Sequence, residues 1–148
     1  MSEQQTIEET EKEIVEEFTF LEENGGDRSE YIIDIGKKFP PLPENDKVDD
    51  NIIKGCQSLV WLTSHYKDGR VFFNADSNSV FVKGLISLLV RVLSGQRPDD
   101  ILKAKLEFIN SIGMTSKMSM NRGNGLPKMV EQMKNYALAY KLKTAGGS

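Results

Sequence analysis

The segment S-L-V-W-L-T-S-H-Y-K-D-G-R-V-F-F, from Ser58 to Phe73, decides the fold because the side chains in its first half follow the two-residue period of a strand. Neighbouring side chains of a strand point to opposite faces, so this half divides into two sets: Leu59, Trp61, Thr63 and His65, and Val60, Leu62, Ser64 and Tyr66. Lys67-Asp68-Gly69 then supplies turn residues before the apolar run Val71-Phe72-Phe73. The segment therefore predicts a β-hairpin.

Two helices are predicted before this hairpin. Thr6-x-x-Glu9 reads as a capping box, and apolar residues at helical spacing continue until Asn24-Gly25-Gly26. A second helix begins near Asp27 and ends before Pro40-Pro41, since proline lacks a backbone donor and restricts the residue before it. Residues 40–50 are expected to form a polar loop.

Further helices are predicted after the hairpin. Residues 80–93 follow several potential capping residues and are apolar nearly all round, which is typical of a buried helix that Gly95 would end. A short helix opens at Arg97-Pro98, residues 106–112 are ambiguous, and apolar residues hold one face from Leu126 to Tyr140. The pattern predicts an α+β fold with helices packed on one side of a small antiparallel sheet. We expect one domain over residues 1–148, with flexible ends at about 1–6 and 144–148.

Composition excludes several classes of function. The chain has 148 residues, a formal net charge of −3 and a pI of about 5.3, so nucleic acid is not expected as its main partner. The acidic first residues do not resemble a secretory signal, and the apolar run from Val80 to Leu93 is shorter than the roughly 20 residues that span a bilayer. We therefore expect a cytoplasmic protein without a membrane segment. One cysteine and one histidine do not suffice for a Cys/His metal site, so neither a metal nor a cofactor is predicted.

Cys56 is the main candidate for chemistry. A lone cysteine is more often a small buried hydrophobe than a nucleophile, but Gly55 gives the chain freedom beside this one at a predicted turn. His65 is poorly placed to activate the thiol, because a strand extended back to Cys56 would place the two residues on opposite faces. Arg122 is the better cation, since it lies in a glycine-rich stretch at the start of the last helix, where anions are favoured. The alternative for Arg122 is a surface arginine paired with an acidic neighbour.

Three blocks of sequence resemble the SufE family of cysteine desulfuration proteins. They are I-I-K-G-C-Q-S-L-V-W (Ile52 to Trp61), A-D-S-N-S-V-F-V-K-G-L-I (Ala75 to Ile86) with the following S-G-Q-R-P-D-D-I-L, and G-M-T-S-K-M-S-M-N-R-G-N-G-L (Gly113 to Leu126). Their order and spacing match over roughly residues 10–142. The chain departs from the family at Lys117, where a histidine is common, at Ser119-Met120-Asn121-Arg122, where Ser-Pro-Ser-Arg is common, and at Pro127, early in the last helix.

The resemblance implies a persulfide carrier with the fold of the IscU-type scaffolds. Cys56 would take sulfur from a SufS-like, pyridoxal-phosphate-dependent cysteine desulfurase, stimulate that enzyme, and pass the sulfur to a SufBCD-like scaffold for iron–sulfur cluster assembly. Arg122 would support the sulfur or dock the partner. Asp76, Lys83 and Gly84 would touch a partner, although Asp76 equally suits capping and Lys83 solvation of its helix.

The residues agree with this role, because a thiolate attacking a sulfur–sulfur bond needs neither metal nor cofactor. Shelter against neighbours such as Val60 or Trp61 would protect a persulfide and raise the pKa of the thiol, so activation would wait for the partner. Trp61 itself is expected in the core. Three alternatives stay open: a CsdE-like relay to another sulfur-requiring pathway, a thiol enzyme acting on a small molecule, and an interaction domain with an inert cysteine. The desulfurase, the downstream acceptor and the oligomeric state are not determined by the sequence.

Overall fold

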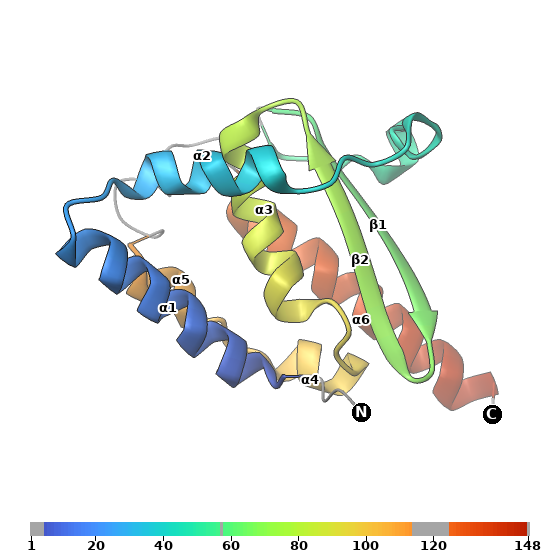
Figure 1. Ribbon diagram of the computed structural model, residues 1–148. Coiled ribbons are helices and arrows are strands. Elements are labelled where there is room, and N and C mark those ends of the chain that lie inside the picture. Colours follow the sequence, from blue (N-terminus) through green and yellow to red (C-terminus); the bar gives the residue numbers. More distant parts are fainter. Residues whose placement is uncertain (1–4, 57, 114–124, 148) are drawn as a thin grey trace.

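A computed structural model describes residues 5–56, 58–113 and 125–147 (Figure 1). Helices and a single hairpin alternate along this part of the chain, and the arrangement confirms the α+β class. The elements are α1 (Ile7–Glu23), α2 (Arg28–Lys38), the 3₁₀ turns η1 (Glu44–Asp46) and η2 (Asp49–Asn51), β1 (Val60–Lys67), β2 (Arg70–Ser77), α3 (Val80–Leu93), α4 (Pro98–Lys103), α5 (Phe108–Ser111) and α6 (Leu126–Gly147).

The hairpin forms where the alternating pattern predicts it. β1 and β2 pair antiparallel from Val60 opposite Ser77 to Lys67 opposite Arg70. Asp68 and Gly69 join them with φ values of 54° and 78°, and two residues with positive φ give the backbone twist that a two-residue hairpin turn needs. β2 extends beyond the predicted Val71–Phe73 run to Ser77, because the more polar residues at its end still pair with β1.

One face of the hairpin is covered by α3 and α6. The side chains of Val60, Leu62, Val71, Phe73 and Ala75 point to this face and are buried. α3 packs against β2 and is buried along nearly its whole length, as its apolar sequence predicts. α6 crosses the same face, where Tyr140 stacks on Tyr66 at a centroid distance of 5.2 Å and its hydroxyl lies 2.9 Å from Ser64 Oγ. The core therefore lies between the hairpin and these two helices.

Local signals in the sequence explain how α1 and α2 begin. Thr6 Oγ1 accepts a hydrogen bond from Glu9 N while the Glu9 carboxylate accepts one from Thr6 N, which confirms the capping box. Asp27 caps α2 through Glu30 N.

Among the described residues, no helix is both long and apolar enough to cross a membrane.

α2 and α3 cross at two glycines. A Cβ atom built on Gly84 would overlap the carbonyl oxygen of Ile32, and one built on Gly36 would overlap that of Val80. Both glycines are buried in this contact. Gly84 therefore has a packing role inside the fold, and its surface is not available to a partner.

Candidate functional site

The loop that carries Cys56 connects η2 to β1, and both of its ends are fixed to the hairpin. Before the loop, Ile53 N donates a hydrogen bond of 2.8 Å to Val60 O. After it, Leu59 N donates to Asn78 Oδ1 at 3.0 Å, and Leu59 O accepts from Ser77 Oγ at 2.8 Å. Hydrogen bonds therefore hold the backbone on both sides of Cys56, at Ile53 and at Leu59.

Cys56 lies against the start of α6. Its side chain is half-buried at the edge of the core, and a Cβ atom built on Gly125 would overlap Cys56 Sγ and lie 3.0 Å from Cys56 Cβ. Gly125 has a φ of 73°, which glycine adopts without strain. The sulfur therefore occupies space that exists only because residue 125 has no side chain. We call this space the Gly125 socket.

Gly55 brings the loop close to the first turn of the same helix. Its φ is 94°, and a Cβ atom built there would lie 3.0 Å from Lys128 Cγ and 3.2 Å from Lys128 Cε. The aliphatic part of Lys128 thus covers Gly55, while its ammonium group remains exposed and lies 3.7 Å from Glu131. The conformational freedom expected for Gly55 is used to fit the loop under this lysine.

Burial and the helix end act on the Cys56 thiol in opposite directions. Burial raises the pKa of the thiol above its ordinary value, since the thiolate loses hydration. Met129 N donates to Gly125 O at 2.9 Å, so the sulfur also lies at the N-terminal end of α6, where a helix favours negative charge. The net direction for the pKa is upward. At neutral pH the group is therefore a protonated thiol.

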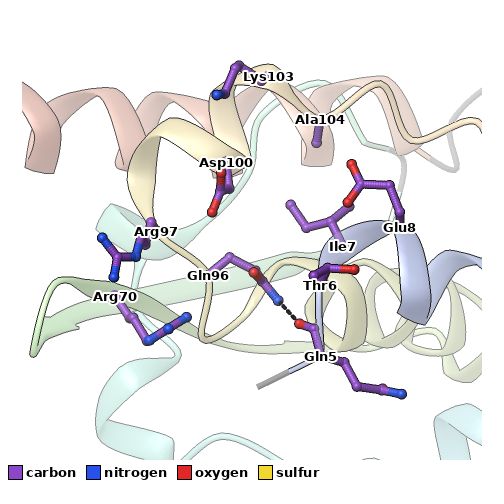
Figure 2. A pocket seen from close by; sticks show the side chains of 10 residues that line it. All are labelled: Gln5, Thr6, Ile7, Glu8, Arg70, Gln96, Arg97, Asp100, Lys103 and Ala104. Carbon is purple, nitrogen blue, oxygen red and sulfur yellow. Dashed lines mark hydrogen bonds between the residues drawn. The ribbon is translucent and has the colours of Figure 1, made fainter. Parts of the chain in front are cut away.

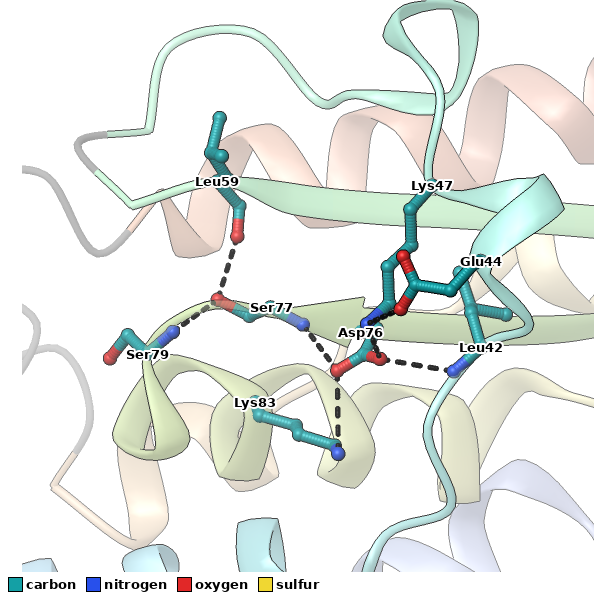
Figure 3. A network of polar contacts seen from close by, with 8 residues as sticks. All are labelled: Leu42, Glu44, Lys47, Leu59, Asp76, Ser77, Ser79 and Lys83. Atoms are coloured by element: carbon teal, nitrogen blue, oxygen red, sulfur yellow. Dashed lines mark hydrogen bonds and ion pairs between the residues drawn. The ribbon is translucent and has the colours of Figure 1, made fainter.

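Asp76, one of the residues considered for partner contact or capping, lies inside the protein (Figure 3). It is 3% exposed, and its carboxylate accepts hydrogen bonds from Leu42 N at 3.0 Å and Ser77 N at 2.8 Å. Lys47 Nζ lies 3.2 Å and Lys83 Nζ 3.3 Å from its oxygens. Burial alone would raise the pKa of Asp76, but these donors and ammonium groups outweigh it and lower the pKa.

The structure decides between the alternatives for Asp76 and Lys83 and corrects the expectation for Trp61. Of the four potential caps at residues 76–79, Ser79 caps α3, since its Oγ accepts a hydrogen bond from Val82 N, and Asp76 does not. Lys83 does not solvate its helix, because its side chain points to the buried carboxylate. Trp61 is only partly buried and lies outside the core, on the outer face of the hairpin, with Lys47 Nζ 5.7 Å from its ring centroid. Lys47 was missed because a lysine in a polar loop carries no sequence signal of its partner.

The other candidate residues are not brought to Cys56 by the described structure. β1 begins at Val60, so Cys56 is not on the strand, and His65 lies near the strand's far end, stacked on Phe72 at 5.1 Å. Arg122 and Lys117 fall outside the described residues. Over residues 5–56, 58–113 and 125–147, no three His, Cys, Asp or Glu side chains are arranged to hold a metal ion.

Exposed apolar and basic side chains surround the loop. Leu59 is 43% exposed and Val80 is 39% exposed, and the hydrogen bonds between Leu59 and Asn78 bring both to the same end of the hairpin. Lys54 and Lys128 are also exposed. An apolar patch bordered by cations is a surface that a protein partner could cover.

Comparison with known proteins places these features in a family. The chain is 33% identical over 130 residues to an uncharacterised SufE-like protein of Rhizobium meliloti, with 84% of this chain and 92% of the relative covered. It is 29% identical over 128 residues to a protein of Plasmodium falciparum named cysteine desulfuration protein SufE, with 83% of this chain but 51% of that protein covered.

The fold is also shared with a solved structure. The solution structure of a hypothetical protein from Thermus thermophilus matches with a TM-score of 0.69 and 21% sequence identity, over 88% of this chain and 94% of the other. Residues 12–137 match the family described as SufE: Fe-S metabolism associated domain. The resemblance that the sequence blocks indicated is therefore confirmed, and this chain belongs to the SufE family.

Proposed function

We propose that this protein is a sulfur acceptor that takes sulfane sulfur onto Cys56 from the persulfide of a cysteine desulfurase. Membership of the SufE family and the similarity to a relative named as a cysteine desulfuration protein support a role in sulfur transfer. The observation that carries the assignment to Cys56 is its position: a single thiol on a loop anchored at both ends, with its sulfur in the Gly125 socket.

The transfer is one displacement at sulfur. The Cys56 thiolate attacks the outer sulfur of the desulfurase persulfide, a new sulfur–sulfur bond forms on Cys56, and the old bond breaks with its electron pair on the desulfurase cysteine. Before the attack, the Cys56 thiol gives its proton to water or to a basic group of the docked desulfurase, and the thiolate left on the desulfurase can take up a proton in turn. No metal or cofactor on this chain takes part, and the pyridoxal phosphate of the reaction belongs to the desulfurase.

The raised pKa of Cys56 suits a carrier that reacts only when docked. In the free protein the protonated, half-buried thiol is a weak nucleophile and is shielded from oxidants. Docking over the exposed Leu59 and Val80 would hold the two sulfurs together and allow proton removal. We further propose that the loaded protein delivers its sulfur to a SufBCD-like scaffold for iron–sulfur cluster assembly, and that Arg122 supports the sulfur or the docked desulfurase.

The test is sulfur uptake measured by intact-protein mass spectrometry. After incubation with a cysteine desulfurase and L-cysteine, the wild-type chain should gain the mass of one sulfur atom and lose it on treatment with dithiothreitol. Cys56→Ser should fold and bind the desulfurase, because serine has nearly the same shape, yet gain no sulfur and fail to increase desulfurase turnover. If the wild type gains no sulfur, or Cys56→Ser stimulates turnover equally, Cys56 is an inert cysteine in an interaction domain.

A further inference from the structure

A second site is suggested by a hollow at the opposite end of the hairpin from Cys56. Its volume is about 380 Å³, and it lies between the start of α1, the start of β2 and helix α4 (Figure 2). Arg70, which lines it, pairs with Lys67 beside the hairpin turn, whereas Cys56 precedes the first residue of β1. The eight residues of β1 separate the two places by roughly 25 Å. The hollow is therefore distinct from the Gly125 socket.

A buried amide projects toward the middle of this hollow. Gln96 is 4% exposed, its Nε2 donates to Gln5 O at 2.8 Å, and its backbone N and O bond to Leu93 O and Val71 N. Its Oε1 accepts no hydrogen bond from any residue in the described ranges, and Figure 2 shows the amide between Gln5 and Asp100. Gln96 lines the hollow, and among the described residues no fully enclosed side-chain nitrogen or oxygen lacks a partner. We therefore infer that Oε1 faces the hollow. An N–H group of a ligand would satisfy it.

The hollow is lined by charges of both signs that do not neutralise one another. Arg70, Arg97 and Lys103 are positive, and Glu8 and Asp100 are negative. Within the part of the chain that the structure describes, none of the five forms an ion pair, and Arg70 donates only to the backbone oxygen of Gly95, at 2.9 Å. Three positive and two negative groups leave a formal charge of +1 on the lining. The complementary ligand carries both signs and a net charge of −1.

We propose that this hollow binds a free amino dicarboxylate such as glutamate. The ammonium group donates to Gln96 Oε1 and faces the carboxylate of Asp100, while the two carboxylates of the ligand bind Arg70 and Arg97 and the ammonium of Lys103. A volume near the lower end of the range for small-molecule sites, about 300–1,000 Å³, suits a ligand of this size. The proposal does not rest on the sulfur-acceptor function, because no residue is shared between the two sites.

Calorimetric titration of the full chain tests the proposal. L-Glutamate should bind at one site per chain with a Kd of about 1 mM or tighter, as expected for a small ligand in an open site. Glutarate, which lacks the ammonium, and L-glutamine, which lacks the second negative charge, should bind at least about fivefold more weakly. Absence of saturable glutamate binding, or equal binding of glutarate, would overturn the proposal.

Three variants separate this site from general electrostatic effects. Arg97→Ala should weaken glutamate binding by about tenfold. Asp100→Asn should weaken glutamate but strengthen glutarate, because the repelling carboxylate is removed while the partner of the ammonium is lost. Asp99→Asn is the control on the same turn of α4: Asp99 pairs with Lys141 and does not line the hollow, but its carboxylate also interacts with Lys103. Its removal should therefore change the binding of glutamate and glutarate in the same direction, unlike Asp100→Asn.

The outcomes for the two sites are independent. Cys56→Ser should bind glutamate like the wild type, so loss of sulfur uptake alone leaves this proposal standing. Equal effects of Asp99→Asn and Asp100→Asn on both ligands would assign any binding to the overall field of α4 and contradict a site in the hollow.

Discussion

Replacing Gly125 by alanine should expel the Cys56 sulfur from its socket without removing the thiol. The new methyl group would occupy the position of Cys56 Sγ, and alanine at a φ of 73° costs about 1–2 kcal/mol in its own right. Because Cys56 is on a short loop anchored at both ends, the loop can move outward while the hairpin stays paired. We therefore expect a folded variant, destabilised by about 1–3 kcal/mol, with an exposed cysteine.

The chemical consequence follows from the cause of the pKa shift. Burial raises the pKa of Cys56, so the pKa of an exposed thiol should fall back toward the ordinary value of a cysteine. Below its pKa, each unit by which the pKa falls increases the thiolate fraction about tenfold. The rate of iodoacetamide labelling at about pH 7.5, measured by intact mass, should rise at least about fivefold over that of the wild type. The midpoint of the pH–rate curve should move to lower pH.

A matched control removes the effect of backbone strain. Gly69 has a φ of 78°, but a Cβ atom built there meets nothing within 4 Å, so Gly69→Ala adds the strain without the displacement. It should lower the urea midpoint to a similar degree and leave labelling unchanged. If Gly125→Ala is destabilised but labels no faster than Gly69→Ala, the socket does not shelter the sulfur and the reasoning is refuted.

Two further predictions concern charged residues. Asp76→Asn should lower the free energy of unfolding by about 1–3 kcal/mol, because the hydrogen bonds and ion pairs of a buried carboxylate are weakened. The pKa of Asp76 is lowered, so its stabilisation is present above about pH 4 and is lost as the pH falls through the native pKa. A urea midpoint equal to that of the wild type at about pH 7 would contradict this. Arg122→Ala should reduce sulfur transfer from the desulfurase while leaving the unfolding midpoint unchanged, and undiminished stimulation of the desulfurase would remove Arg122 from the mechanism.

Much of the fold could be predicted because its signals are local. The alternation from Leu59 to Tyr66 assigned Val60 and Leu62 to the same face, and the structure buries both against the helices. The capping box at Thr6 and Glu9 and the apolar sequence of α3 likewise involve residues a few positions apart. Such patterns depend on backbone periodicity, which a sequence displays directly.

The details of the site could not be predicted, because they depend on distant contacts. Gly125 and Cys56 are far apart in the sequence, and only the packing of α6 brings them together. In the sequence, Asp76 looks like a capping residue and Lys47 like a loop lysine, although in the fold the partly exposed Lys47 pairs with the buried Asp76 carboxylate. The only sequence signal of the Gly125 socket was the glycine itself, just before the last helix, and a glycine at that position is explained equally well by a turn.

For the sulfur acceptance that we propose, shelter and reactivity make opposite demands on Cys56. In the structure, different contacts hold the loop and the sulfur. Hydrogen bonds fix the backbone at Ile53 and Leu59, at the two ends of the loop. Among the described residues the sulfur itself is held by packing against Gly125 and the adjoining core, with no hydrogen bond to Sγ. Under the proposed function, a partner that covers the loop would lose only a few van der Waals contacts when it withdraws the sulfur, and the hydrogen bonds at Ile53 and Leu59 would limit the movement of the loop. The same contacts would restore the protonated, sheltered thiol when the partner leaves, so the raised pKa is compatible with the proposed sulfur acceptance.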